Sequence, residues 1–187
     1  MAHPNANRNR LIEIVKARSF STGAEIKLVS GRSSNFYFNM KPTMLDAEGA
    51  YLIATLVLDS IKGEDVDLVG GLEMGAVPLA SAVAVMSHTM GWPLQAFFVR
   101  KQAKEHGAKK LIEGLAPNET LKRKRVVILE DVTTTGGSSM KAIEAVKTEG
   151  GEIVRVISIV DRLEGAADSF KAAGVPFSAV LTVDDFR

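Results

Sequence analysis

Two adjacent acids followed by a run of small and hydroxyl-bearing residues form the most informative segment of the chain. Glu130 and Asp131 come directly after the apolar run 126–129, and the loop after them leads into an expected helix. Small residues let backbone N–H groups approach an anion closely, and a helix start adds unpaired N–H groups and the positive end of its dipole. The pattern predicts a phosphate site formed by Val132, Thr133, Thr134, Thr135, Gly136, Gly137 and Ser138.

The two acids indicate that the ligand is more than a phosphate. A carboxylate repels phosphate, but it accepts hydrogen bonds from the neighbouring hydroxyl groups of a ribose. Strand, acids, loop and helix together therefore predict a ribose 5-phosphate site, whereas the alternative is a helix-capping loop with two solvated acids. Neither a GxxxxGK[ST] loop nor a GxGxxG turn after a strand is present, which argues against a P-loop ATPase and a dinucleotide site.

A second chemical cluster lies in the basic segment 100–107, after an expected strand at 96–99. Lysine and arginine can neutralise a leaving group that gains negative charge at the transition state, and histidine can donate a proton near neutral pH. Gly107 and Gly114 favour a loop that moves and excludes water on closing. The alternative is an ordinary solvated basic loop. The residues concerned are Arg100, Lys101, Lys104 and His106.

Composition narrows the classes of function. The 187 residues carry a net charge of +1 and no cysteine, so disulfides, thiolate nucleophiles and cysteine metal sites are excluded. The balanced charge gives no reason to expect nucleic acid or membrane as a partner. The polar N-terminus does not resemble a signal peptide, and no apolar run approaches the roughly 20 residues that span a bilayer. We therefore expect a cytoplasmic protein.

The elements that must position these residues fall into two regions of one expected domain, 1–187. In region 1–45, residues 9–18 predict an amphipathic helix, and the alternating segments 25–29 and 36–40 predict a β-hairpin. This region is expected to form a small α+β hood.

Region 46–187 alternates strands with helices, which predicts a mostly parallel sheet covered on both faces. Asp46 is expected to cap a buried helix that ends near residue 62, and Pro78 to lie in the first turn of a helix that ends near Met90. Residues 70–75 are interpreted as a loop. Ligands of such sheets bind at the carboxyl ends of the strands. The expected strands are 67–69, 96–99, 126–129 and 153–160.

The segment from Glu130 to Ser138 resembles the signature of the type I phosphoribosyltransferase family. In that family the loop holds the 5-phosphate of 5-phosphoribosyl 1-diphosphate (PRPP), and the acids hold the ribose hydroxyls. The resemblance implies the α/β fold of that family. Residues 98–107, FVRKQAKEHG, are similar to the RKxxKxHG loop of its orotate-specific branch. This implies that Arg100 binds pyrophosphate, that Lys101, Lys104 and His106 are catalytic, and that a homodimer shares its active sites.

Further stretches fit the same branch. Residues 30–39 are similar to its N-terminal hood, which implies that Tyr37 and Phe38 lie beside orotate, together with Thr134 and Arg162. For the aromatic pair the alternative is hairpin core, and for Arg162 it is a surface salt bridge. The implied reaction converts orotate and PRPP to orotidine 5′-monophosphate and pyrophosphate in pyrimidine biosynthesis. The implied cofactor is Mg²⁺, held mainly by substrate and water. Rival functions are a phosphoribosyltransferase for a purine or uracil, and a non-catalytic regulator that senses PRPP.

Two positions depart from the pattern of that branch. Many members carry a lysine where this chain has Val29, and Lys27, two residues earlier, is the candidate replacement. Many also carry a lysine in the loop that corresponds to 72–76. Backbone N–H groups, or a metal near Glu73, are the candidate replacements there. The sequence assigns no role to the last twenty or so residues.

Overall fold

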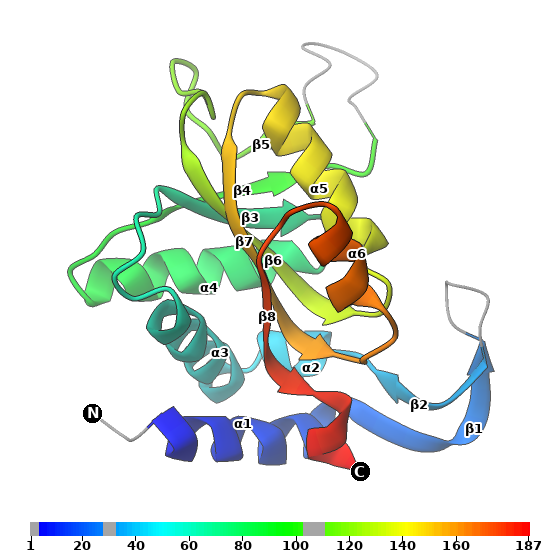
Figure 1. Cartoon of the computed structure of the whole chain (residues 1–187). Helices are drawn as coiled ribbons and strands as arrows, with labels where there is room; N and C mark the ends of the chain where they lie inside the picture. The colour runs from blue at the N-terminus through cyan, green and yellow to red at the C-terminus, as the bar shows by residue number, and fades with distance from the viewer. Residues whose placement is uncertain (1–3, 28–32, 103–110) are drawn as a thin grey trace.

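The computed structural model describes residues 4–27, 33–102 and 111–187. Its centre is a six-stranded sheet in the order β5-β4-β3-β6-β7-β8 (Figure 1). All neighbouring strands are parallel except β4 and β5, which confirms the predicted mostly parallel sheet. The strands are β3 (Leu68–Leu72), β4 (Gln95–Val99), β5 (Ile112–Glu113), β6 (Arg125–Thr133), β7 (Glu152–Asp161) and β8 (Phe177–Thr182).

Helices cover both faces of the sheet (Figure 1). One face packs against α3 and α4, and the other against α5 and α6. Along β6, Val127 and Leu129 enter the first core, whereas Val126 and Ile128 enter the second. Burial on both faces explains why this strand is an uninterrupted apolar run. The helices are α3 (Ala47–Ser60), α4 (Ala76–Thr89), α5 (Gly137–Thr148) and α6 (Ala166–Ala172).

The N-terminal region forms a separate two-stranded antiparallel sheet, which confirms the predicted hairpin. Its first strand begins at Phe20, earlier than expected, and its second ends at Phe38 because the chain then enters a helix. Phe20 pairs with Phe38 across the two strands, and their ring centroids lie 4.9 Å apart. This aromatic contact extends the hairpin beyond its alternating segments. The elements are α1 (Pro4–Arg18), β1 (Phe20–Lys27), β2 (Ser33–Phe38) and α2 (Lys41–Met44).

The C-terminal residues join the sheet to this N-terminal region. Strand β8 forms one edge of the large sheet and leads into a 3-10 helix, η1 (Val183–Phe186). The ring of Phe186 lies 5.3 Å from Phe20 and 5.0 Å from Phe38 between centroids. Arg8 of α1 forms an ion pair of 2.7 Å with Asp185. The last turn of the chain therefore packs against α1 and the hairpin (Figure 1).

The starts of α3 and α4 follow the sequence signals, whereas α1 begins at Pro4, before the expected residue 9, and ends at Arg18 as expected. The carboxylate of Asp46 accepts the N–H of Gly49 at 3.1 Å, which confirms the predicted cap of α3. Pro78 lies in the first turn of α4 as expected, whereas α3 ends at Ser60, before the expected residue 62. Among the described residues, no helix is both long and apolar enough to cross a membrane.

Gly70, Gly71 and Leu72 lie inside β3, so the interpretation of 70–75 as a loop was wrong for these three residues. A Cβ atom on Gly70 would lie 2.5 Å from the ring carbons of Phe97 in β4. A Cβ atom on Gly71 would lie 2.8 Å from the Cβ of Ala76, at the start of α4. Glycine is needed here because neighbouring elements approach the strand closely, and not because the chain turns.

Gly70→Ala should destabilise the fold by about 3 kcal/mol, the upper part of the range for overpacked cores. The added methyl group would overlap Phe97 in the adjacent strand. The measurement is the free energy of unfolding in urea. Gly137→Ala is the matched control, because a Cβ atom there meets nothing within 4 Å. Equal stability of the two variants would contradict this account of β3.

Candidate active site

The centre of the sheet contains a topological switch point. β3 continues through α4 to β4 on one side, and β6 continues through α5 to β7 on the other. Such a reversal opens a crevice at the carboxyl ends of the two central strands, where α/β proteins bind ligands. The loops after β3 and β6 meet there: a Cβ atom on Gly75 would lie 2.5 Å from Oδ1 of Asp131.

The acid pair at the end of β6 has one buried and one accessible member. Glu130 is 8% exposed, and its carboxyl group accepts the hydroxyl of Ser139 at 2.8 Å. Burial, followed by the negative charge of Asp131, raises the pKa of Glu130 to about 8; the hydroxyl of Ser139 and the charge of Lys101 act in the opposite direction. Asp131 is only partly buried, and its Oδ1 accepts the N–H of Val132 at 3.0 Å. The pair therefore presents a buried carboxyl group with a raised pKa beside an accessible one.

The predicted phosphate loop, 132–138, is only partly a loop: β6 runs to Thr133 and α5 begins at Gly137, so residues 134–136 form the turn between them. Its backbone turns at Gly136, where φ is +86°, a left-handed conformation that favours glycine. A Cβ atom on Gly136 would also lie 2.9 Å from the ring of Phe170. A small pocket of about 30 Å³ lies over this turn and the N-terminus of α5. It is lined by Glu130, Val132, Thr133, Thr134, Gly136, Gly137 and Ser138.

The three threonines of the loop differ in their surroundings. Thr133 is the last residue of β6, and its hydroxyl donates to Ser158 Oγ at 2.8 Å inside the sheet. The side chain of Thr133 is thus used within the core, although the sequence suggested a hydroxyl donor for phosphate. Thr134 is partly buried and Thr135 is exposed. The accessible hydroxyl groups of the loop therefore belong to Thr134, Thr135 and Ser138.

The described residues on the two sides of 103–110 are hydrogen-bonded to each other. The N–H of Arg100 donates to the carbonyl of Leu111 at 2.9 Å, and β4 pairs with the short antiparallel strand β5, which the sequence did not predict. The guanidinium of Arg100 lies 3.9 Å from Glu113. The N–H of Lys101 donates to Oε1 of Glu73 at 2.8 Å. Lys104 and His106 lie outside the described residues.

Arg162 is a buried cation, and the ion pair that it forms with Glu164 is largely buried as well. Its side chain is 2% exposed, and its Nε donates to Oε1 of Glu164 at 2.8 Å. Its guanidinium lies 4.3 Å from the centre of the Phe36 ring. The backbone N–H of Arg162 donates to the carbonyl of Thr133 at 2.9 Å, so the arginine is adjacent to the phosphate loop.

The two aromatic residues expected beside the base lie on opposite faces of β2. Phe38 is 5% exposed and belongs to the aromatic cluster with Phe20 and Phe186, which agrees with the core alternative. Tyr37 is 42% exposed. Phe36, not singled out from the sequence, is the aromatic residue of this strand that contacts Arg162.

Two contacts of the site were also missed in the sequence. Ser139 interrupts the apolar stripe that continues at Ile143 and Val146, and a hydroxyl in such a stripe is a detectable signal of a buried partner. Glu73 was named only as the residue beside a candidate metal, and its contact with Lys101 gives no sequence signal, because the two residues are 28 positions apart. Val29 and the side chain of Lys27 lie outside the described part of the chain, so the replacement at that position stays a prediction.

These features define the class of protein. Residues 43–186 match the family model for the phosphoribosyl transferase domain, and the chain belongs to this family of phosphoribosyl-transferring enzymes. The resemblance seen in the sequence is thereby confirmed.

Comparisons within the family point to one branch. The chain is 58% identical over 182 residues to the orotate phosphoribosyltransferase of Bradyrhizobium diazoefficiens, and the match covers 97% of each chain. It is similar in structure to the Mycobacterium tuberculosis orotate phosphoribosyltransferase in complex with Fe(III) dicitrate, with a TM-score of 0.82, 38% identity, and coverage of 96% and 98%. The same enzyme in complex with PRPP gives a TM-score of 0.78 and 35% identity, with the same coverage.

Glu130→Gln should make stability less dependent on pH. Between pH 4.5, the ordinary pKa, and about 8, folded Glu130 retains a proton that the unfolded chain has lost. Wild-type stability therefore falls as pH rises through this window. The free energy of unfolding of the glutamine variant should therefore rise relative to that of the wild type by up to about 1.4 kcal/mol per pH unit. Urea unfolding from pH 5 to 9 measures this, and a constant difference would contradict a raised pKa.

Proposed function

We propose that this protein is an orotate phosphoribosyltransferase, which converts orotate and PRPP to orotidine 5′-monophosphate and pyrophosphate in pyrimidine biosynthesis. The observation that carries the proposal is the placement of Glu130 and Asp131 beside the phosphate loop at the switch point. The names of its relatives support orotate as the base. Residues 1–187 would act as a single domain, with 1–45 as the hood.

The loop and the acids would bind the sugar phosphate half of PRPP. Backbone N–H groups from 132–138 and the hydroxyls of Thr134, Thr135 and Ser138 would donate to the 5-phosphate. Asp131, the accessible acid, would accept hydrogen bonds from the ribose hydroxyls. A raised pKa keeps much of Glu130 protonated near neutral pH, which lowers its repulsion of phosphate and lets it donate as well as accept.

The basic segment would act on the leaving group. Departure of pyrophosphate leaves positive charge on the ribose ring and adds negative charge to the leaving oxygen. Arg100, Lys101 and Lys104 would stabilise that negative charge, and His106 would donate a proton or hydrogen bond to it. The reaction requires no covalent nucleophile: the protein places N1 of orotate against C1 of the ribose while the C1–oxygen bond weakens.

Mg²⁺ is the proposed cofactor. Asp131 offers the hard, partly exposed oxygen ligand that this ion prefers, and Mg²⁺ usually keeps several waters and substrate oxygens in its shell. The described residues include no group of three or more histidine, cysteine or acidic side chains arranged for a metal. We therefore propose that substrate and water supply most of the ligands. The bound ion would neutralise part of the pyrophosphate charge.

Orotate would lie between the hood and the end of β7. The guanidinium of Arg162 suits the carboxylate of orotate, and Thr134 and Tyr37 would border the base. Phe38 would contribute through the core of the hairpin. We further propose a cytoplasmic homodimer with shared active sites that uses neither nucleic acid nor membrane as a partner.

The direct test is the loss of orotate absorbance after PRPP and Mg²⁺ are added to the wild-type protein. Turnover with release of pyrophosphate is expected. A preference for hypoxanthine, adenine or uracil would instead assign the protein to another base. Binding of PRPP without turnover of any base would favour the regulator.

Lys104→Ala should lower kcat by on the order of 10²-fold, the scale of losing one group that stabilises transition-state charge. Steady-state turnover of orotate with saturating PRPP is the measurement. Lys62→Ala, at an exposed lysine beyond the end of α3, is the control and should keep wild-type turnover. Normal kcat in the Lys104 variant would remove the basic segment from the mechanism.

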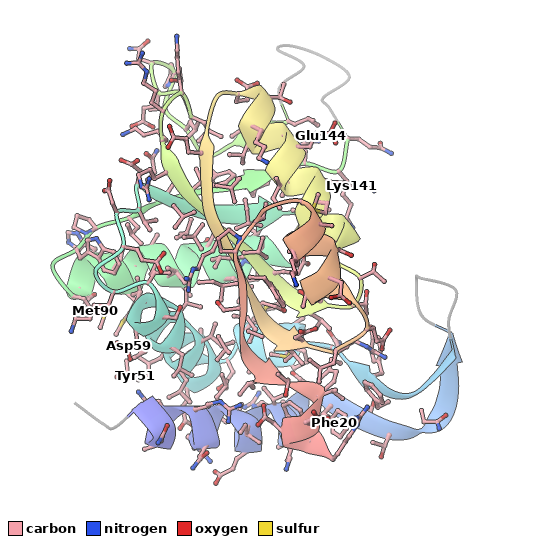
Figure 2. The ribbon with its side chains drawn as sticks, in the orientation of Figure 1. Phe20, Tyr51, Asp59, Met90, Lys141 and Glu144 are labelled. Atoms are coloured by element: carbon pink, nitrogen blue, oxygen red, sulfur yellow. The ribbon has the colours of Figure 1, made fainter. Side chains whose placement is uncertain are left out.

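Asp131→Asn should weaken PRPP binding by about tenfold while the fold stays intact, because a charged acceptor of hydroxyl hydrogen bonds is lost. Calorimetric titration with PRPP and Mg²⁺ measures the effect. Asp59→Asn is the matched control, since Asp59 projects from α3, away from the phosphate loop (Figure 2). Equal affinity in the two variants would show that Asp131 does not bind the sugar.

A further inference from the structure

We propose that Glu73 is a positioning residue that fixes the first part of the basic segment against the turn after β3, and thereby aims Lys101 at the pyrophosphate half of the site. The inference rests on the proposed function and adds a residue to which the family signature assigns no role. It also accounts for the acid in a turn where many orotate-specific members carry a lysine.

Glu73 extends the pairing of β3 and β4 beyond their last residues. The parallel register ends with Leu72 opposite Val99, and the N–H of Glu73 then donates to the carbonyl of Val99 at 2.8 Å. Two residues after Val99, the N–H of Lys101 donates to Oε1 of Glu73 at 2.8 Å. The side chain thus supplies an acceptor where the ladder of backbone hydrogen bonds has stopped. A hydrogen bond to a charged acceptor is stronger than a neutral one.

The hydrogen bond between the N–H of Lys101 and Glu73 connects the two halves of the crevice. Gly75, two residues after Glu73, lies directly against the carboxylate of Asp131. The backbone of Lys101 is therefore attached to the turn that borders the acid pair. Consistent with this proximity, the charge of Lys101 acts on the carboxyl group of Glu130 in the same chain.

Arg100, next to Lys101, makes a different contact. Its N–H donates to the carbonyl of Leu111, which does not attach it to the acid pair. The bond to Glu73 is thus the described contact that sets the position of Lys101 relative to β3 and β6. The carboxylate of Glu73 acts through Lys101 and not on the substrate.

Three variants separate the hydrogen bond from the charge. Glu73→Gln keeps an oxygen acceptor and removes the charge, whereas Glu73→Ala removes both. Glu73→Asp keeps the charge but shortens the side chain by one methylene. Glu144→Ala is the matched control: Glu144 is an exposed acid of α5 that lines the same 440 Å³ cavity as Lys101 (Figure 2).

The measurements are kcat, the KM values for PRPP and orotate, and binding of pyrophosphate with Mg²⁺ by calorimetry. Glu73→Ala and Glu73→Asp should weaken pyrophosphate binding and raise the KM for PRPP by about five- to tenfold, the scale of one lost hydrogen bond. The KM for orotate should change by less than about twofold, since the base binds elsewhere. Glu144→Ala should resemble the wild type, and Glu73→Gln should lie between the wild type and Glu73→Ala, because it keeps the acceptor and loses only the charge.

The proposal is overturned if Glu73→Ala and Glu73→Asp bind pyrophosphate as the wild type does, or if Glu73→Gln is impaired as strongly as Glu73→Ala. If the alanine variant fails to fold, the aspartate variant alone decides. Absence of orotate turnover in the wild-type protein would sink the proposed function instead, and pyrophosphate binding by the variants would still test the role of Glu73.

Discussion

A carboxyl group buried at the end of the central strand is the constraint around which the site is built. Glu130 lies on β6, whose preceding residues are fully buried between two cores. An ionised carboxylate in such a place is costly, so its pKa rises and the hydroxyl of Ser139 satisfies one of its oxygens. Because Ser139 belongs to the first turn of α5, this hydrogen bond also attaches the start of that helix to the acid pair. The distance between acids and phosphate loop is thereby set by the core.

Close packing of backbone brings the second central strand to the same place. Gly70 and Gly71 let β4 and α4 approach β3, and Gly75 leaves room for the carboxylate of Asp131. A side chain at Gly71 or Gly75 would push against Leu129 or Asp131 of β6, and one at Gly70 would push against Phe97 of β4. Because these glycines have no side chains, the crevice is narrow. Glu73, in the same turn as Gly75, holds the start of the basic segment.

The side of the site proposed for the base depends on residues from both ends of the chain. Phe36 lies over the guanidinium of Arg162, and the neighbouring Phe38 packs with Phe20 and Phe186. Arg8 and Asp185 add an ion pair between the first helix and the last turn. Planar contact with an aromatic ring and a bond to Glu164 restrict how the arginine can be oriented. The C-terminal residues therefore have a role in supporting the hairpin.

Local signals in the sequence determined the family, the strand that carries Glu130 and Asp131, the cap at Asp46 and the alternation that yields a parallel sheet. These features depend on neighbouring residues, because apolar runs, caps and helix starts are short-range properties. Tertiary structure alone decided that Gly70 and Gly71 lie in a strand, that the hydroxyl of Thr133 turns to Ser158, and that Phe36 meets Arg162. It also decided that Glu73 accepts the N–H of Lys101. Each of these contacts joins residues far apart in the chain. The packing of sheets and helices decides which distant partner a side chain meets.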